Sequence, residues 1–256
     1  SWSAFSDELK KHDFDETVLI KAGLGKKNKD GGLYDVFRDR LIFPIRDRKG
    51  RVVGFGGRVM NPEDQPKYLN TGDTPVFQKG KELYGLYESL ENRRDLKDIY
   101  VVEGYMDAVA MSENKINNAV ATLGIATNRF HVQKLLQLVN VIIFCFDGDI
   151  AGKKAAWKAL TNSLSEIRDT VNVGFSFIDN GQDPDQLCNE NPKEFKKLIK
   201  KNTPLSEFMF ESLSKNIDLN KVEGKTKFVG LILPLIEQLP KGLYKKLLLE
   251  KLSDLT

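Results

Sequence analysis

The sequence predicts an α/β protein with three parts: an N-terminal mixed α/β subdomain, a central parallel sheet with flanking helices, and a C-terminal helical bundle. Three observations predict this class. Glycine-rich β-type runs lie in the first third, apolar runs alternate with helical segments in the middle, and apolar residues recur at helical spacing near the end. The chain has 256 residues, of which 41% are hydrophobic, enough for more than one compact unit. We place the parts at residues 1–97, 98–190 and 191–256.

The first part begins with short helices within residues 1–30 and a polar turn at 23–32 that offers no apolar face. Two β-rich runs follow, at 41–45 and 51–55. They are separated by the turn-forming cluster Asp-Arg-Lys-Gly at 47–50. This arrangement predicts an antiparallel hairpin.

The middle part alternates strands with helices. We expect strands at 99–102, 119–122, 141–146 and 173–178 and helices at 105–111, 129–138 and 151–167. Continuous apolar strands separated by helices are typical of a parallel sheet that is covered on both faces.

The last part is predicted to be helical. Asn191 precedes Pro192, which is a helix N-cap followed by proline at the first helical position. Apolar residues at helical spacing from Leu205 to Leu239 predict a small bundle. Pro234 is expected to kink or divide one of its helices.

Composition excludes several classes of protein. The longest apolar stretch, 139–146, is far shorter than the roughly 18 residues that span a bilayer, and no leader pattern is visible at the N-terminus. We therefore expect no membrane contact. The only two cysteines, Cys145 and Cys188, are too few for a disulfide scaffold or a four-cysteine zinc site. A reducing cytoplasm is the expected location.

Acidic residues follow the predicted strands. Glu103 comes after the first, Asp147 and Asp149 come after the third, and the fourth runs into Asp179, Asp183 and Asp185. Ligands gather beyond the carboxyl ends of parallel strands, so we expect Glu103, Asp147, Asp149, Asp183 and Asp185 to converge. Asp179 is interpreted as a turn residue.

Such a cluster of carboxylates predicts bound divalent cations, because unpaired charges at short range repel one another. Oxygen ligands without nearby His or Cys favour Mg²⁺ or Mn²⁺, and two such ions would suit phosphoryl transfer. The simpler alternative is that each acidic residue only caps the helix that follows it. The net charge also changes along the chain. Residues 99–190 are net acidic, whereas residues 1–98 and 191–256 are net basic, and the basic excess of the first segment lies at 38–81. This distribution suits central metal ions with a polyanion beside them.

The motifs resemble a known family. Val-Val-Glu-Gly-Tyr-Met-Asp at 101–107, followed by Phe-Asp-Gly-Asp-Ile-Ala-Gly at 146–152, is similar to the Toprim domain of primases, topoisomerases and some nucleases. Phe-Pro-Ile-Arg-Asp at 43–47, Gly-Phe-Gly-Gly-Arg at 54–58 and Pro-Lys-Tyr-Leu-Asn at 66–70 closely resemble bacterial DnaG-type primases. The resemblance covers residues 33–190 in the family's order, and the helical end fits the rest of the family's RNA polymerase domain.

The resemblance implies roles for particular residues. Glu103 would be a metal ligand or general base, Asp147 and Asp149 would hold the metals, and Asp183 and Asp185 would complete the shell of the second ion. Asp107 would orient its neighbours. The template strand or the nucleotide phosphates would contact Arg38, Arg58, Lys67, Asn70 and Lys79. Without the resemblance, Arg46, Arg48 and Arg51 are equally good basic candidates, although their hairpin position also suits a solvated surface. Among the tyrosines, Tyr68 is the best candidate for base stacking.

The implied function is metal-dependent synthesis of short RNA primers on a single-stranded DNA template from ribonucleoside triphosphates. Family members also carry a zinc-ribbon domain and a domain that docks on the replicative helicase, and we expect neither in this chain, which would correspond to the catalytic core. Two alternatives stay open: a Toprim-type nuclease or topoisomerase fragment, and a non-catalytic nucleic-acid-binding module whose acidic cluster is structural.

Overall fold

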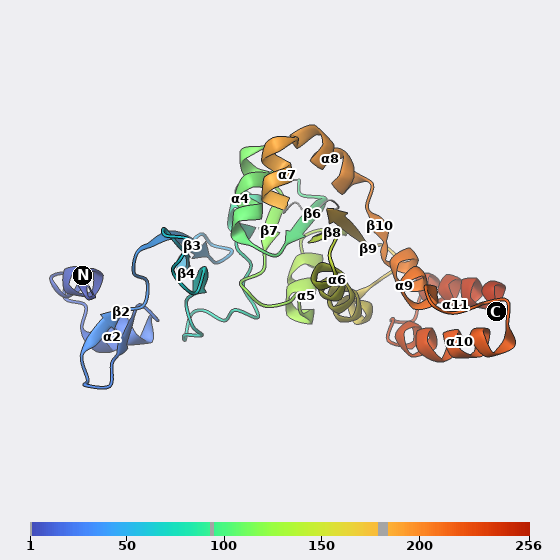
Figure 1. The fold of residues 1–256 in the computed structure, drawn as a ribbon, viewed down its shortest axis with the longest axis horizontal. Helices are drawn as coiled ribbons and strands as arrows, with labels where there is room; N and C mark the ends of the chain where they lie inside the picture. Colours follow the sequence, from blue (N-terminus) through green and yellow to red (C-terminus); the bar gives the residue numbers. More distant parts are fainter. Residues whose placement is uncertain (1, 93–94, 179–183) are drawn as a thin grey trace. The chain divides into compact units, whose positions relative to one another are not determined.

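The computed structural model describes residues 2–92, 95–178 and 184–256. Its contacts divide the chain into two compact units, Ser1–Tyr87 and Glu88–Thr256 (Figure 1). The described helices and strands are mixed throughout, so the predicted α/β class is confirmed. The three-part division predicted at 97 and 190 stays a prediction. No helix among the described residues is long and apolar enough to cross a membrane.

The first unit begins with two short helices and a hairpin. These elements are α1 (Ala4–Lys10), α2 (Glu16–Lys21), β1 (Gly25–Lys27) and β2 (Leu33–Asp35). Asp35 accepts hydrogen bonds from the backbone N–H groups of Phe5 and Ser6 at 2.8 and 2.9 Å, and so holds the start of α1 on the hairpin. The polar stretch predicted as a turn therefore contributes strand β1. Its lysines point outward, and the hairpin depends on pairing with β2 rather than on an apolar face.

The predicted hairpin is present. It consists of β3 (Arg40–Arg46) and β4 (Val52–Val59), and β5 (Tyr68–Asn70) adds a third antiparallel strand. Asp47 closes the turn because its Oδ1 accepts the backbone N–H groups of Lys49 and Arg51, while the Arg51 guanidinium pairs with Oδ2 at 2.6 Å. Arg51 thus has the surface role that its hairpin position suggests. Ile45, Phe77 and Leu83 are fully buried and form the core of this unit.

The second unit contains a five-stranded sheet in the order β10-β9-β8-β6-β7. Its strands are β6 (Asp98–Val102), β7 (Ala119–Ala121), β8 (Val141–Asp147), β9 (Asn172–Ile178) and β10 (Thr203–Pro204). The first four are parallel, which confirms the prediction, and only β10 is antiparallel. The two-residue β10 has no apolar run that could identify it from sequence.

Helices cover both faces of this sheet (Figure 1). One face carries α4 (Tyr105–Glu113), α7 (Pro184–Glu190) and α8 (Pro192–Lys200), and the other carries α5 (Arg129–Leu136) and α6 (Ile150–Ser163). The short helix α3 (Leu86–Asn92) precedes the sheet. Alternating side chains fit these two layers: Phe144 stacks on Phe146 and Phe175 on one face, whereas Ser176 bonds the backbone of α8 on the other.

Three helices end the chain: α9 (Leu205–Ser214), α10 (Val222–Glu237) and α11 (Leu243–Leu255). Phe228, Ile232 and Ile236 of α10 are fully buried and form its packed stripe. Pro234 was expected to kink or divide a helix, and division does not occur, because α10 continues through it. Buried residues lie on both sides of the proline, so packing holds the two halves in one helix.

Candidate active site

The strand order creates a switch point between β6 and β8. The chain leaves β6 to form β7 on one side and returns to form β8 on the other, so the two crossovers diverge where β6 and β8 lie side by side. In open parallel sheets, ligands bind in the crevice at this point, beyond the carboxyl ends of the strands. Glu103 directly follows β6, and Asp147 is the last residue of β8. The two carboxylates therefore flank the position where chemistry is expected.

Local hydrogen bonds fix the turn that carries Glu103. The backbone N–H of Gly104 donates to the Asp107 carboxylate at 3.0 Å, which closes the first turn of α4. The Thr122 hydroxyl, directly after β7, donates to the Glu103 carbonyl at 3.3 Å. The backbone at Glu103 is thus tied to two neighbouring segments while its side chain stays exposed.

The turn from β8 into α6 positions the two aspartates. The Gly148 N–H donates to the carbonyl of Ile178 on β9 at 2.8 Å, so this turn is anchored to the next strand. Asp149 is the N-cap of α6, and its Oδ1 accepts the Gly152 N–H at 2.7 Å. A helix cap, the simpler interpretation of these acidic residues, is therefore realised at Asp149.

Gly152 lets α6 approach the end of β8 closely. A Cβ atom at this position would lie 2.1 Å from the carbonyl oxygen of Asp147. The absence of a side chain is thus required for Asp147 and the start of α6 to lie where they do. This role of Gly152 was not predicted, although a glycine at the end of the 146–152 motif is the signal in the sequence that could have indicated it.

The carboxylates influence one another electrostatically. The Glu103 side chain is exposed on one side but loses part of its hydration to neighbouring groups, and this desolvation, followed by the charges of Asp147 and Asp149, raises its pKa. Burial also raises the pKa of Asp107 to about 7, and the charges of Asp185 and Asp147 add to this effect against the hydrogen bond from Gly104. Asp185 lies in the first turn of α7, which packs on α4. The structure therefore brings four of the predicted residues, Glu103, Asp147, Asp149 and Asp185, within electrostatic range, directly or through Asp107.

Two of the acidic residues named from the sequence, Asp179 and Asp183, lie outside the described residues. Within the described ranges, no group of three or more His, Cys, Asp or Glu side chains is arranged to hold a metal ion. Burial and mutual repulsion raise the pKa values of Glu103 and Asp107, and a divalent cation beside such carboxylates would relieve the repulsion. Mg²⁺ commonly binds through one or two carboxylates together with waters and substrate phosphates, so an open donor set suits it.

In the first unit, three of the predicted basic and polar residues lie on one face of the β3-β4-β5 sheet or next to it. The Arg58 guanidinium and the Lys67 ammonium lie 5.8 and 5.6 Å from the ring centre of Tyr68. Tyr68 is the register partner of Arg58, and Asn70, two residues further on, points to the same face opposite Gly56. We name Arg58, Lys67, Tyr68 and Asn70 the β4-β5 patch.

The other two predicted residues have different surroundings. Arg38 lies over the rings of Trp2 and Tyr34, at 4.5 and 5.2 Å, and its guanidinium donates to the Asp35 carbonyl at 2.5 Å. This guanidinium is held in place by its own hairpin. The backbone N–H of Lys79 donates to the Asp73 carboxylate at 3.0 Å, so this bond holds the Lys79 backbone and does not involve the Lys79 ammonium group.

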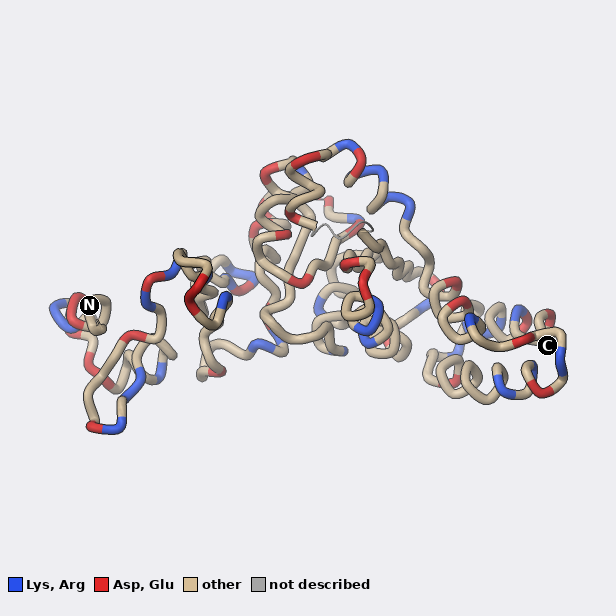
Figure 2. The backbone as a smooth tube through the Cα atoms, in the orientation of Figure 1, with Lys and Arg blue, Asp and Glu red and all other residues tan. Residues whose placement is uncertain are grey.

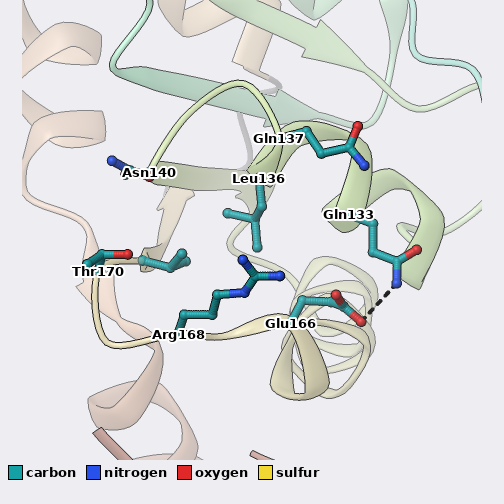
Figure 3. A pocket seen from close by; sticks show the side chains of 8 residues that line it. Gln133, Leu136, Gln137, Asn140, Glu166, Arg168 and Thr170 are labelled. Atoms are coloured by element: carbon teal, nitrogen blue, oxygen red, sulfur yellow. Dashed lines mark hydrogen bonds between the residues drawn. The ribbon is translucent and has the colours of Figure 1, made fainter. Parts of the chain in front are cut away.

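A pocket of about 400 Å³ lies at the opposite end of the same strands (Figure 3). It opens near Asn140 and Thr170, which precede β8 and β9. Glu166 is bound there by Gln133 at 3.1 Å and by Arg129 at 2.5 Å, and these bonds lower its pKa against the effect of burial. This pocket is therefore separate from the carboxylates at the switch point.

Comparison with known proteins identifies the family. Family models match residues 1–90 (DNA primase catalytic core, N-terminal domain), 100–188 (Toprim-like) and 206–256 (DnaB-helicase binding domain of primase). The crystal structure of a DNA primase domain from Pseudomonas aeruginosa is 45% identical in sequence and superposes with a TM-score of 0.93. The match covers 100% of this chain and 80% of the solved chain. The chain belongs to the DnaG-type primase catalytic cores. Toprim-containing primases use divalent metal ions.

Other DnaG-type primases give the same result. The Escherichia coli primase catalytic core has a TM-score of 0.93 at 42% identity, and a DnaG primase catalytic domain solved with bound ssDNA has 0.92 at 41%. Both matches cover all of this chain, together with 82% of the solved Escherichia coli chain and 80% of the chain solved with ssDNA. The curated DNA primase of Legionella pneumophila is 46% identical over 93% of this chain and 42% of its own length. The chain thus spans about two fifths of the curated relatives it matches.

One expectation from the sequence is wrong. We expected the helicase-docking domain of the family to be absent, but a family model named for DnaB-helicase binding matches residues 206–256. That segment comprises α9, α10 and α11. Apolar periodicity identified it as a helical bundle but carries no information about a binding partner.

Proposed function

We propose that this chain synthesises short RNA primers on single-stranded DNA by metal-dependent nucleotidyl transfer, as the catalytic core of a replicative primase. The observation that carries the proposal is the position of the carboxylates. Glu103 and Asp147 flank the switch point of the parallel sheet, and Asp149 begins the next helix. This is the position where an open α/β sheet binds its substrate.

Each carboxylate has a proposed task. Asp147 and Asp149 would hold two divalent ions, Mg²⁺ or Mn²⁺, with Asp183 and Asp185 completing the oxygen ligands of the second ion. Bound there, the ions supply activation of the attacking oxygen and stabilisation of the leaving one. Glu103 would bind the first ion or take the proton of the 3′-hydroxyl. Its raised pKa suits proton transfer, because a carboxylate with a higher pKa is a stronger base.

Asp107 would position the site rather than bind metal. Its carboxylate accepts a hydrogen bond from the N–H of Gly104, the residue directly after Glu103. Burial raises the pKa of Asp107, and the charges of Asp185 and Asp147 raise it further, so Asp107 lies within electrostatic range of both. Asp107 therefore connects the turn that carries Glu103 with the other two acidic segments. Moving it would change the direction of Glu103 without removing a ligand.

The substrates and partners follow from charge and from relatives. The β4-β5 patch combines cations with an exposed tyrosine, which suits single-stranded DNA or the phosphates of ribonucleoside triphosphates. Arg38 and Lys79 would contribute to the same binding. A solved relative is bound to ssDNA, and the match over 206–256 supports contact with the replicative helicase. Both cysteines are free and buried, which suits a reducing cytoplasm.

Substitution of Asp149 separates catalysis from helix capping. Asp149→Asn keeps an oxygen that can accept the Gly152 N–H but removes the negative charge, whereas Asp149→Ala removes both and should cost about 1 kcal/mol of stability. We expect Asp149→Asn to unfold within about 0.5 kcal/mol of the original chain. Its incorporation of labelled ribonucleotides on single-stranded template should nevertheless fall to background.

The matched control is Asp95→Asn, which removes an equal charge at an exposed residue whose ion pair within the described residues is with Lys97. It should retain primer synthesis. Full incorporation by Asp149→Asn would show that Asp149 is a cap only. Nicking of supercoiled DNA without triphosphates would instead favour the nuclease or topoisomerase alternative.

A further inference from the structure

A second surface feature lies between α6 and α9. A groove of about 950 Å³ separates these helices, and we name it the α6-α9 groove after its lining, which includes Ile150, Lys153, Trp157, Phe177, Phe208 and Lys215. Both helices pack on the same face of the sheet, α6 on β8 and α9 on β9. Clefts of roughly 300–1,000 Å³ that are lined by aromatic side chains and a few polar groups are where proteins commonly bind ligands, so the groove is large enough for an occupant.

The floor of the groove is aromatic. Phe208 lies 4.8 Å from Phe175 and 5.3 Å from Phe177, measured between ring centres, and Trp157 meets Phe208 edge-on at 6.5 Å. Phe175 is fully buried, whereas Trp157, Phe177 and Phe208 are partly exposed. The cluster thus extends from the core to the surface and presents flat rings that the core supports from below.

The rim of the groove is basic. Lys153, Lys154 and Lys215 are exposed, and within the described part of the chain none of them forms an ion pair, while one acidic residue, Glu211, also lines the groove. The lysine-rich stretch of α6 is blue in Figure 2. Lys153 and Trp157 are four residues apart, so a cation and a ring share one face of α6. The uncompensated charge favours an anionic occupant.

The groove also lies next to the acidic edge of the sheet. Ile150 and Lys153 are in the first turn of α6, directly after Asp149. Phe177 is one residue before the end of β9, at the register position of Phe146, which directly precedes Asp147. An occupant of the groove would therefore continue toward the carboxylates.

We propose that the α6-α9 groove binds single-stranded nucleic acid, with bases stacked on Trp157 and Phe208 and phosphates beside Lys153, Lys154 and Lys215. Supported aromatic rings flanked by cations are the combination with which proteins hold single strands, because every base has a face that stacks and every linkage carries a charge. We take the strand to be the single-stranded DNA template of the proposed function. The site is distinct from the β4-β5 patch and from the carboxylates.

Trp157 provides a direct test, because Trp2 is the only other tryptophan. In the full chain carrying Trp2→Phe, with EDTA and without triphosphates, oligothymidylate and oligouridylate should quench the Trp157 emission saturably. Tighter binding of the DNA oligomer supports the template as the occupant, and tighter binding of the RNA oligomer would contradict it. Since neither metal nor synthesis is involved, a failed primer assay leaves this result unaffected, and failure here leaves the primer proposal standing.

Charge reversal in the same background tests the rim. Lys153→Glu with Lys215→Glu should weaken the binding that quenches Trp157 at least tenfold and reduce the slope of log affinity against log salt by about 1.4, since each single-strand phosphate contact contributes about 0.7. The control, Lys197→Glu with Lys227→Glu, changes the net charge equally at exposed lysines on α8 and α10 and should alter affinity less than threefold. Three results would overturn the proposal: unchanged Trp157 emission, equal effects of the two double variants, or equally effective quenching by polyglutamate of matched charge.

Discussion

Replacing Gly152 by alanine tests how the fold holds the carboxylates. The residue is the third of α6, in the first turn of the helix, and alanine is normally favoured over glycine in a helix by up to about 1 kcal/mol. Here the added Cβ would meet the Asp147 carbonyl oxygen at 2.1 Å, its carbonyl carbon at 2.9 Å and its nitrogen at 3.1 Å. Ordinary contacts begin at 3.4 Å, so α6 and the end of β8 must separate by about 1 Å.

The magnitude follows from two opposing effects. Overpacking against a backbone group costs about 1–3 kcal/mol, which offsets or exceeds the gain in helix propensity. A displacement of about 1 Å at a reacting group can reduce a rate about a hundredfold. We therefore expect Gly152→Ala to lose up to about 2 kcal/mol of unfolding free energy and to lose primer synthesis out of proportion to this loss.

The assay combines chemical denaturation with ribonucleotide incorporation. Gly230→Ala is the matched control, because a Cβ there has no neighbour within 4 Å in the interior of α10, and it should stabilise the chain by about 0.5–1 kcal/mol with unchanged incorporation. If Gly152→Ala were as stable and as active as Gly230→Ala, the close approach of α6 to Asp147 would not matter, and the reasoning would be refuted.

Three further predictions follow from individual residues. In the folded chain the pKa of Asp107 rises from the ordinary 3.8 to about 7, so the folded state binds this proton more tightly than the unfolded state. Without metal, the free energy of unfolding should therefore fall by a few kcal/mol as the pH rises from 4 to 7. Chemical denaturation at several pH values should show this fall in the original chain and not in Asp107→Asn. Arg58→Ala and Lys67→Ala should each weaken the binding of single-stranded DNA whatever its sequence, as measured by fluorescence anisotropy. Each should also reduce the slope of log affinity against log salt concentration by about 0.7, the contribution of one phosphate contact. An unchanged slope would show that the β4-β5 patch is not part of the binding surface. Asp35→Ala leaves the partly buried N–H of Phe5 and the buried N–H of Ser6 without their acceptor and should cost about 2–3 kcal/mol of unfolding free energy. The α1 amides should then exchange with deuterium faster than in Asp35→Asn, which keeps one acceptor oxygen, and equal protection in both variants would contradict this.

The parallel sheet was predictable because each of its four longer strands is a continuous apolar run, and such runs have few alternative structures. The short strands β1 and β10 could not be predicted. Their sequences, Gly-Lys-Lys and Thr-Pro, have no apolar run, and they become strands only by pairing with β2 and β9. Pro234 shows the same limit in reverse: a local helix breaker is overridden by buried packing on both sides.

The site divides in a similar way. Acidic residues after strands could be recognised in the sequence, because parallel strands direct their carboxyl ends to one edge. The adjacency of β6 and β8, which makes that edge a switch point, depends on strand order and is visible only in the fold. The Asp149 cap, the Gly152 approach and the rings around Arg38 depend on distances that no sequence pattern encodes.

The account depends on divalent ions binding to the carboxylates at the switch point, and calorimetric titration with Mn²⁺ near pH 7 tests this most directly. Because Glu103 and Asp107 have raised pKa values, binding should release protons, which two buffers of different ionisation enthalpy will count. We expect binding with proton release by the original chain and by Asp95→Asn, and loss of binding in Asp147→Asn. Equal Mn²⁺ affinity in Asp147→Asn and in the original chain would contradict the central claim.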